Sequence, residues 1–88
     1  MLYMVIEEFR DSRAVYERLQ AMGRMAPEGL EYVGSWIDEG IERCFQLMRT
    51  DDARLLEVWA ANWRDIMDFE FVPVISSAEA AARALAQS

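Results

Sequence analysis

Apolar and β-favouring residues form four segments of strand length along the chain. The first covers residues 2–9, the next two cover 30–38 and 41–49, and the fourth covers 69–75. Each is bounded by polar, glycine or proline positions, which is typical of strands in a sheet with a covered face. The pattern therefore predicts four strands, with the middle two close enough in sequence to form a hairpin.

Three other segments have the three- or four-residue spacing of amphipathic helices. The first covers residues 12–25, the second follows Asp52 and extends to about Met67, and the third covers 76–88 after a capping-box sequence. Their apolar positions are Val15, Leu19 and Met22 in the first helix, Leu55, Val58, Trp59, Trp63 and Ile66 in the second, and Ala78, Ala81, Ala82 and Leu85 in the third.

The resulting order, β-α-β-β-α-β followed by one more helix, predicts an α+β fold. It is the order of a ferredoxin-like βαββαβ plait with an antiparallel four-stranded sheet, here as a single domain over 1–88 with a C-terminal helix at 76–88. Pro73 predicts an edge position for the last strand, because proline donates no ladder hydrogen bond. Both long helices should cover one face of the sheet. Because so small a domain buries little surface, we expect a homodimer through the open face.

The register of the hairpin follows from the length of its loop. Glu39-Gly40 has the length of a two-residue turn with glycine second, so we expect Asp38 opposite Ile41 and Trp36 opposite Arg43. A two-residue periodicity then assigns every side chain of the hairpin to one face or the other.

The two faces of the predicted sheet differ in how apolar they are. The more apolar set is assigned to the core beneath the helices: Leu2, Met4, Ile6, Tyr32, Gly34, Trp36, Phe45, Leu47, Phe69, Phe71 and Ile75. The opposite, open face then includes Val5, Val72 and Val74 and six residues that we take as candidates for a pocket or a dimer contact: Tyr3, Glu7, Ser35, Cys44, Gln46 and Glu70. Such a mixed face is typical of an interface or a pocket wall.

Charge and composition exclude several classes of partner. The formal net charge is −7, with nine arginines, no lysine and no cluster of basic residues. Binding to nucleic acid or to anionic lipid requires such clusters, so neither is expected as a partner. The N-terminus lacks the pattern of a secretory signal, and no apolar stretch approaches the ~18 residues of a membrane span. With a single cysteine, which fits a reducing compartment, we expect a cytoplasmic protein.

The missing residue types restrict the available chemistry. Without histidine there is no histidine base, histidine metal site or histidine-activated nucleophile, and without lysine there is no Schiff base. No metal-loop spacing occurs among the aspartates, so we expect neither a metal nor another cofactor. Glu7 is either a proton-transfer group with a raised pKa or a carboxylate that is solvated or paired with arginine. Cys44 is expected to be a buried, inert thiol.

Three functions remain open at this point. The first is non-catalytic binding of a small, mostly apolar molecule, or a regulatory role, by a dimeric domain. The second is a cofactor-free enzyme acting on a small organic acid or aromatic, with Glu7 and Tyr3 in proton transfer. The third is a structural interaction module. The absence of any recognisable catalytic motif favours the non-catalytic functions over the enzyme.

The order of segments also resembles a known group of proteins. MLYMVIEEF, GRMAPEGLEYVGSWI, RCFQLMRTDD, WAANWRD and DFEFVPVISS together resemble a small bacterial family of uncharacterised domains. The resemblance covers almost the whole chain. It implies a dimeric α+β barrel, in which two ferredoxin-like sheets pack face to face, and it implies no activity and no catalytic residues. The wider group with this architecture includes cofactor-free monooxygenases, small isomerases and stress-response proteins, which is an analogy of fold only.

Overall fold

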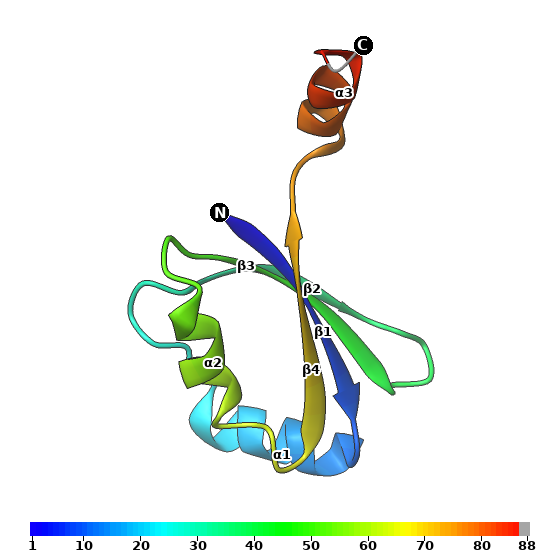
Figure 1. Cartoon of the computed structure of the whole chain (residues 1–88). Helices are drawn as coiled ribbons and strands as arrows, with labels where there is room; N and C mark the ends of the chain where they lie inside the picture. The colour runs from blue at the N-terminus through cyan, green and yellow to red at the C-terminus, as the bar shows by residue number, and fades with distance from the viewer. Residues whose placement is uncertain (87–88) are drawn as a thin grey trace.

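The computed structural model describes residues 1–86 and has the element order expected from the sequence (Figure 1). The strands and helices are β1 (Leu2–Phe9), α1 (Ser12–Met22), β2 (Glu31–Ile37), β3 (Arg43–Arg49), α2 (Arg54–Ala60), β4 (Met67–Val74) and α3 (Ser77–Ala86). The four strands form one antiparallel sheet in the order β2-β3-β1-β4. The predicted α+β fold, a ferredoxin-like plait with an additional C-terminal helix, is confirmed. The last two residues of the helix expected over 76–88 lie outside the described part.

The core lies between the sheet and the two helices α1 and α2, which lie on the same side of the sheet (Figure 1). Its buried members come from both layers: Val5, Val15, Leu30, Met48, Leu56, Trp59, Trp63 and Met67. The expected core positions of the two tryptophans are confirmed. β4 is an edge strand, as the proline at position 73 predicts.

The hairpin between β2 and β3 has a longer loop than the sequence indicated. Asp38 pairs with Arg43, because the Asp38 amide donates to the Arg43 carbonyl at 3.1 Å, and the loop therefore contains four residues. The Asp38 carboxylate accepts hydrogen bonds from the amides of Glu42 and Arg43 at 2.9 and 2.6 Å, and Ile41 takes up a left-handed conformation with φ 56°. Trp36 consequently lies opposite Phe45 and not opposite Arg43.

The assignment of faces was wrong for β1, β3 and the part of β2 from Gly34 onward. Val5, Glu7, Cys44, Gln46 and Met48 are the buried residues of these strands, and they face the helices. The set expected in the core faces the open side instead: Leu2, Met4, Ile6, Phe45 and Leu47, with Gly34 and Trp36 on β2. The physical reason is that both alternating sets of β1 are largely apolar. The faces were therefore assigned from the polar side chains of Glu7 and Gln46, which were expected on the open face.

The residues of β4 and Tyr32 on β2, in contrast, lie on the faces that were expected for them. Phe69 and Phe71 pack against the core as expected, whereas Glu70 is exposed and lies opposite Ile6 on the open face. A register shift between Tyr32 and Gly34 places Tyr32 opposite Met48, on the helix-covered side. A bulge of this kind changes the face on which later residues lie, and loop length alone cannot predict it.

Both long helices end earlier than their apolar periodicity predicted. α1 stops at Met22 because Gly23 adopts φ 68°, and its amide donates to the Leu19 carbonyl at 2.8 Å. α2 stops at Ala60, and a series of turns leads to β4. Two arginines bind this turn region. They donate to the carbonyls of residues 62, 64, 65 and 67 and to the carboxylates of residues 65 and 68: Arg10 and Arg18.

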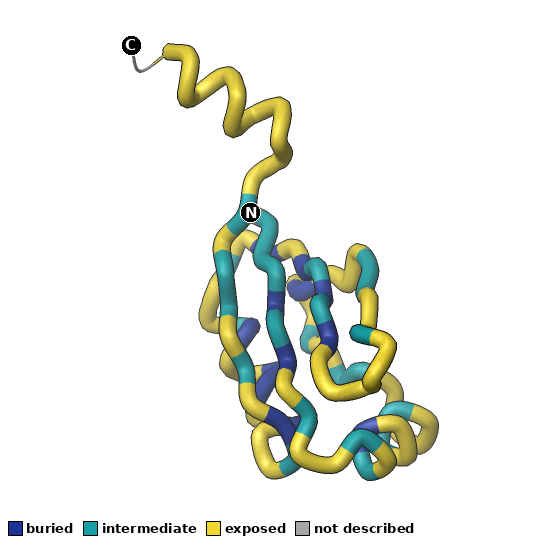
Figure 2. The backbone as a smooth tube through the Cα atoms, turned by 90° about the vertical axis from the view of Figure 1, so that its right-hand side faces the viewer, coloured by how far each residue is buried: buried dark blue, intermediate teal, exposed yellow. Residues whose placement is uncertain are grey.

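The C-terminal helix α3 stands apart from the rest of the domain (Figure 2). None of its ten residues is buried, and the long axis of the molecule, 49 Å, reflects this extension. An isolated helix of fewer than ~12 residues is marginally stable in water. Among the helices of the described residues, none combines the length and the apolar composition that a membrane span requires.

Candidate functional site

A cavity of about 230 Å³ lies between α1, the sheet and α2, and it is partly open to solvent. Its walls are largely aromatic and aliphatic, with contributions from Phe9, Val15, Leu19, Trp59, Trp63 and Met67. Its polar groups come from every layer that surrounds it: Glu7 on β1, Tyr16 on α1, Arg24 after α1, Ser35 on β2 and Cys44 on β3. A concave apolar site with a few convergent polar groups is the usual form of a small-molecule site.

Among the described residues that line the cavity, Glu7 is the only carboxylic acid. Only 6% of its surface is exposed, and burial raises its pKa from 4.5 to about 7, although a hydrogen bond with Cys44 and the nearby charge of Arg24 oppose the rise. Removal from water disfavours the ionised form of a carboxyl group. Near neutral pH the Glu7 carboxyl is therefore close to half protonated, and it can donate as well as accept a hydrogen bond.

Cys44 lies directly opposite Glu7 in the sheet, and the two side chains share a hydrogen bond. Burial and the adjacent Glu7 raise the pKa of the Cys44 thiol to about 12. The thiolate is the reactive form of cysteine, so this thiol is not a nucleophile at neutral pH. The described part of the chain therefore offers no activated cysteine at the cavity.

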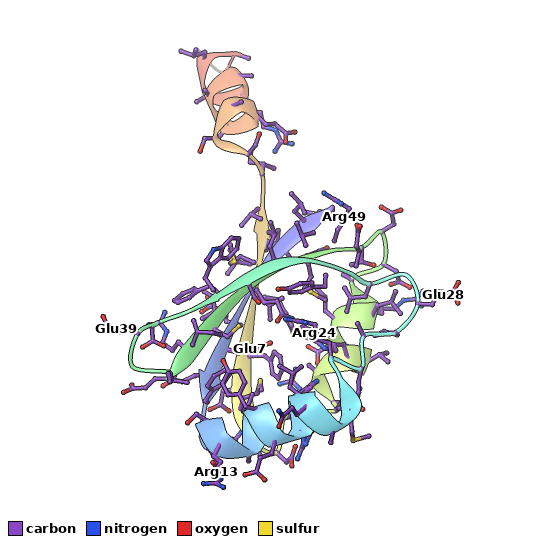
Figure 3. All side chains as sticks on the ribbon, turned by 180° about the vertical axis from the view of Figure 1, so that it is seen from behind. Glu7, Arg13, Arg24, Glu28, Glu39 and Arg49 are labelled. Atoms are coloured by element: carbon purple, nitrogen blue, oxygen red, sulfur yellow. The ribbon has the colours of Figure 1, made fainter. Side chains whose placement is uncertain are left out.

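Arg24 is held in place by both tryptophans of the core. Its main-chain carbonyl accepts one hydrogen bond from Trp59 Nε1 at 3.0 Å and another from Trp63 Nε1 at 3.1 Å. Its guanidinium carbon lies 3.6 Å from the centroid of the Tyr32 ring, and Nη2 lies 3.5 Å from Ser35 Oγ. Figure 3 shows Glu7 and Arg24 in the middle of the molecule between the sheet and α1, unlike Arg13, which projects outward.

Comparison with known proteins gives one match. A family model described as a domain of unknown function (DUF3303) matches residues 1–88. The chain belongs to the DUF3303 family. No curated protein and no solved structure matches it. The suspected membership of an uncharacterised family is confirmed, and the match names no ligand, reaction or partner.

Three of the six candidate residues lie around the cavity, but on the helix-covered side of the sheet. Glu7, Ser35 and Cys44 line it, and they are brought together because β1, β2 and β3 are neighbours. The expectation that they lie on the open face was wrong, since the helices cover them.

The remaining three candidates lie elsewhere. Tyr3 also lies on the helix-covered side, opposite Met48, and not on the open face as expected. Its hydroxyl contacts Met1 Sδ at 3.5 Å, and Tyr3 is four residues along β1 from Glu7, a separation of roughly 13 Å. Gln46 is buried beneath the helices and donates to Met48 Sδ at 3.5 Å. Glu70 is exposed on the open face. A proton-transfer pair of Glu7 and Tyr3 is therefore not assembled.

Sequence reasoning missed two polar groups of the cavity. Arg24 falls within the helix expected over residues 12–25, but the helix ends before it. The signal was available in Gly23, because glycine commonly ends a helix in a left-handed conformation and redirects the chain. Tyr16 lines the cavity, and burial, together with Cys44 and Glu7, raises its pKa.

The arrangement can bind and orient a small molecule and can exchange a proton with it through Glu7. Within residues 1–86, no group of three or more cysteine, aspartate or glutamate side chains is positioned to hold a metal ion. What the cavity provides is an apolar enclosure, a carboxyl group that titrates near neutrality and one cation.

Proposed function

We propose that this domain binds a small, mostly apolar molecule in the cavity between α1 and the sheet. The supporting observation is the cavity itself, about 230 Å³ in volume and walled by two tryptophans and a phenylalanine. At roughly 30 Å³ per water molecule, this is room for about eight waters or a compound of similar size. Transfer of an aromatic or aliphatic body from water to such walls is favourable in proportion to the apolar area covered.

Native mass spectrometry with a mixture of small aromatic and short-chain metabolites tests the proposal. We expect a bound mass on the unmodified chain and its loss in Val15→Phe, because Val15 is buried on α1 and a larger side chain there fills the cavity. Leu85→Phe is the matched control, since Leu85 is exposed on α3, away from the cavity. Absence of any bound mass, or binding that Val15→Phe leaves intact, would contradict the proposal.

A second candidate function is proton transfer by Glu7, which its position in the cavity and its pKa of about 7 favour. A general base is most effective when its pKa lies near the working pH. Deuterium exchange at the carbon next to the carbonyl of phenylpyruvate, followed by NMR, provides a test. Acceleration that disappears in Glu7→Gln would support an enzyme, and exchange no faster than in buffer would count against it.

We also propose that two copies associate through the open sheet face. Its two central strands contribute apolar side chains, and Trp36 on the edge strand β2 is 60% exposed. Four strands ~4.8 Å apart and about seven residues long cover roughly 450 Å² in projection, a size at which exposed apolar patches mark interfaces. Arg43, Glu8 and Glu70 border these apolar side chains without an ion pair among the described residues, so a second copy can supply the opposite charge to each.

Sedimentation velocity at micromolar concentration tests the homodimer. Trp36→Asp adds a charge within the proposed contact and is expected to yield monomer. Val58→Asp, at a residue that is 55% exposed on α2, makes the same kind of change outside the contact and should leave the dimer intact. A monomeric unmodified chain, or equal dissociation by both variants, would refute the interface.

A further inference from the structure

Arg24 differs from every other arginine of the chain. Seven of the nine arginines form an ion pair with a carboxylate of the described residues: Arg10, Arg13, Arg18, Arg49, Arg54, Arg64 and Arg83. Of the two that do not, Arg43 is exposed to solvent, whereas Arg24 is half-buried in the cavity wall. A guanidinium withdrawn from water without a carboxylate partner is costly unless another anion pairs with it.

The contacts that Arg24 does make leave much of its hydrogen-bonding capacity unused. Stacking on Tyr32 satisfies the face of the guanidinium and none of its N–H groups. The contact with Ser35 Oγ, at 3.5 Å, is at the limit of a hydrogen bond, and the buried Nε has no acceptor among residues 1–86. A planar guanidinium in this state matches the two oxygens of a carboxylate.

Glu7 does not take this role. It lies near Arg24 but forms no ion pair with it within 4.0 Å in the described structure. Its burial favours the neutral acid, so below neutral pH the cavity contains a fixed cation that no carboxylate balances. An occupant with one negative charge balances this cation, and a neutral or cationic occupant does not.

We propose that the molecule bound in the cavity is a small organic acid with an aromatic or short aliphatic body, whose carboxylate pairs with the Arg24 guanidinium. This inference rests on the binding function proposed above and names the class of its ligand. The body of the acid lies against Trp63 and Phe9, and the Glu7 carboxyl group, when protonated, donates a hydrogen bond to the ligand. The two indole hydrogen bonds to the Arg24 carbonyl fix the main chain from which the guanidinium projects.

Matched pairs of acid and alcohol provide the test. Benzoate and phenylacetate are titrated against benzyl alcohol and 2-phenylethanol in a Trp36→Phe background, in which all tryptophan emission comes from Trp59 and Trp63. We expect the affinity for each acid to be about tenfold or more higher than for its alcohol. This ratio corresponds to the free energy of one hydrogen bond to a charged group. Raising the salt concentration should weaken the binding of the acids and leave the binding of the alcohols unchanged.

Substitution of the arginine gives a second, independent measurement. Arg24→Gln should weaken the acids by about tenfold or more and leave the alcohols unchanged. Arg13→Gln is the matched control, because it removes the same charge from the exposed side of α1, where Arg13 pairs with Glu17, and it should change neither affinity. The comparison of acid with alcohol in the Trp36→Phe protein needs no change at Arg24, so it decides the question even where Arg24→Gln does not fold.

The outcomes separate this inference from the function on which it rests. If the alcohols bind as tightly as the acids, the cavity is a binding site but the proposed ligand class is wrong. The same conclusion follows if the Arg24→Gln protein binds the acids as tightly as the protein that retains Arg24. If the metabolite mixture leaves no bound mass and neither acids nor alcohols bind, the binding function fails as well. If the Arg24→Gln protein loses affinity for the acids and keeps it for the alcohols, the binding function and the ligand class are both supported.

Discussion

Glu7→Gln tests the electrostatic description of the cavity most directly. Burial raises the Glu7 pKa from 4.5 to about 7 in the folded protein, so the ionised carboxylate opposes folding. At about 1.4 kcal/mol per pH unit, the difference corresponds to roughly 3 kcal/mol. Below pH 4.5 the group is protonated in both states and this penalty is absent; it grows as the pH rises and reaches its full size above about pH 7. Glutamine has nearly the same shape and never carries the charge.

We therefore expect Glu7→Gln to be more stable than the unmodified protein by up to roughly 3 kcal/mol near pH 8.5, and nearly equal to it near pH 4.5. Urea unfolding at both pH values measures the difference, and other titrating groups cancel between the two proteins. Glu28→Gln is the control, because Glu28 is exposed, forms no ion pair among the described residues and lies outside the proposed contact, so it should change stability by less than about 0.5 kcal/mol. A Glu7→Gln protein that is less stable at high pH would show that the ionised carboxylate is paired, and would refute the argument.

Three further outcomes follow from described contacts. Cys44, 3% exposed and with a pKa of about 12, should react with a thiol reagent near pH 8 only after the chain is unfolded in urea. Gly29→Ala should lower the free energy of unfolding by about 1–2 kcal/mol, because Gly29 has φ +95°; Gly40→Ala, whose added Cβ meets nothing closer than 3.4 Å, should cost less. Trp59→Phe and Trp63→Phe each leave one donor on the carbonyl that both indoles share, so the double variant should lose more stability in urea than the sum of the single ones.

Element order and fold class could be predicted from periodicity and turn residues, because these depend on local patterns. The edge position of β4 followed from Pro73, and the core positions of Trp59 and Trp63 followed from their helical spacing. The faces of β1 could not be predicted, since Leu2, Met4 and Ile6 are no less apolar than the residues that alternate with them. Which set is buried depends on which side the helices pack, and that is a property of the whole fold.

The candidate site was predicted only in part for related reasons. Glu7 and Cys44 were assigned to the same face of the sheet, but the polar character of Glu7 led to the open face, whereas the structure buries it beside a cavity. Arg24 could not be placed from helical periodicity, because α1 ends at Met22 and Gly23 redirects the chain before Arg24. Burial of a polar group beside a cavity violates the pattern by which faces are assigned, and such violations concentrate at functional sites.

The paired indole bonds to the Arg24 carbonyl give the domain an internal spectroscopic reporter. Two of its three indole N–H groups point at one oxygen atom beside the cavity, and the third belongs to Trp36 on the opposite side of the sheet. In a ¹H–¹⁵N spectrum of the ¹⁵N-labelled protein with an unlabelled ligand, two indole resonances should therefore shift together when the ligand binds in the cavity. The third should not shift. Occupancy can be followed at atomic resolution without any added probe.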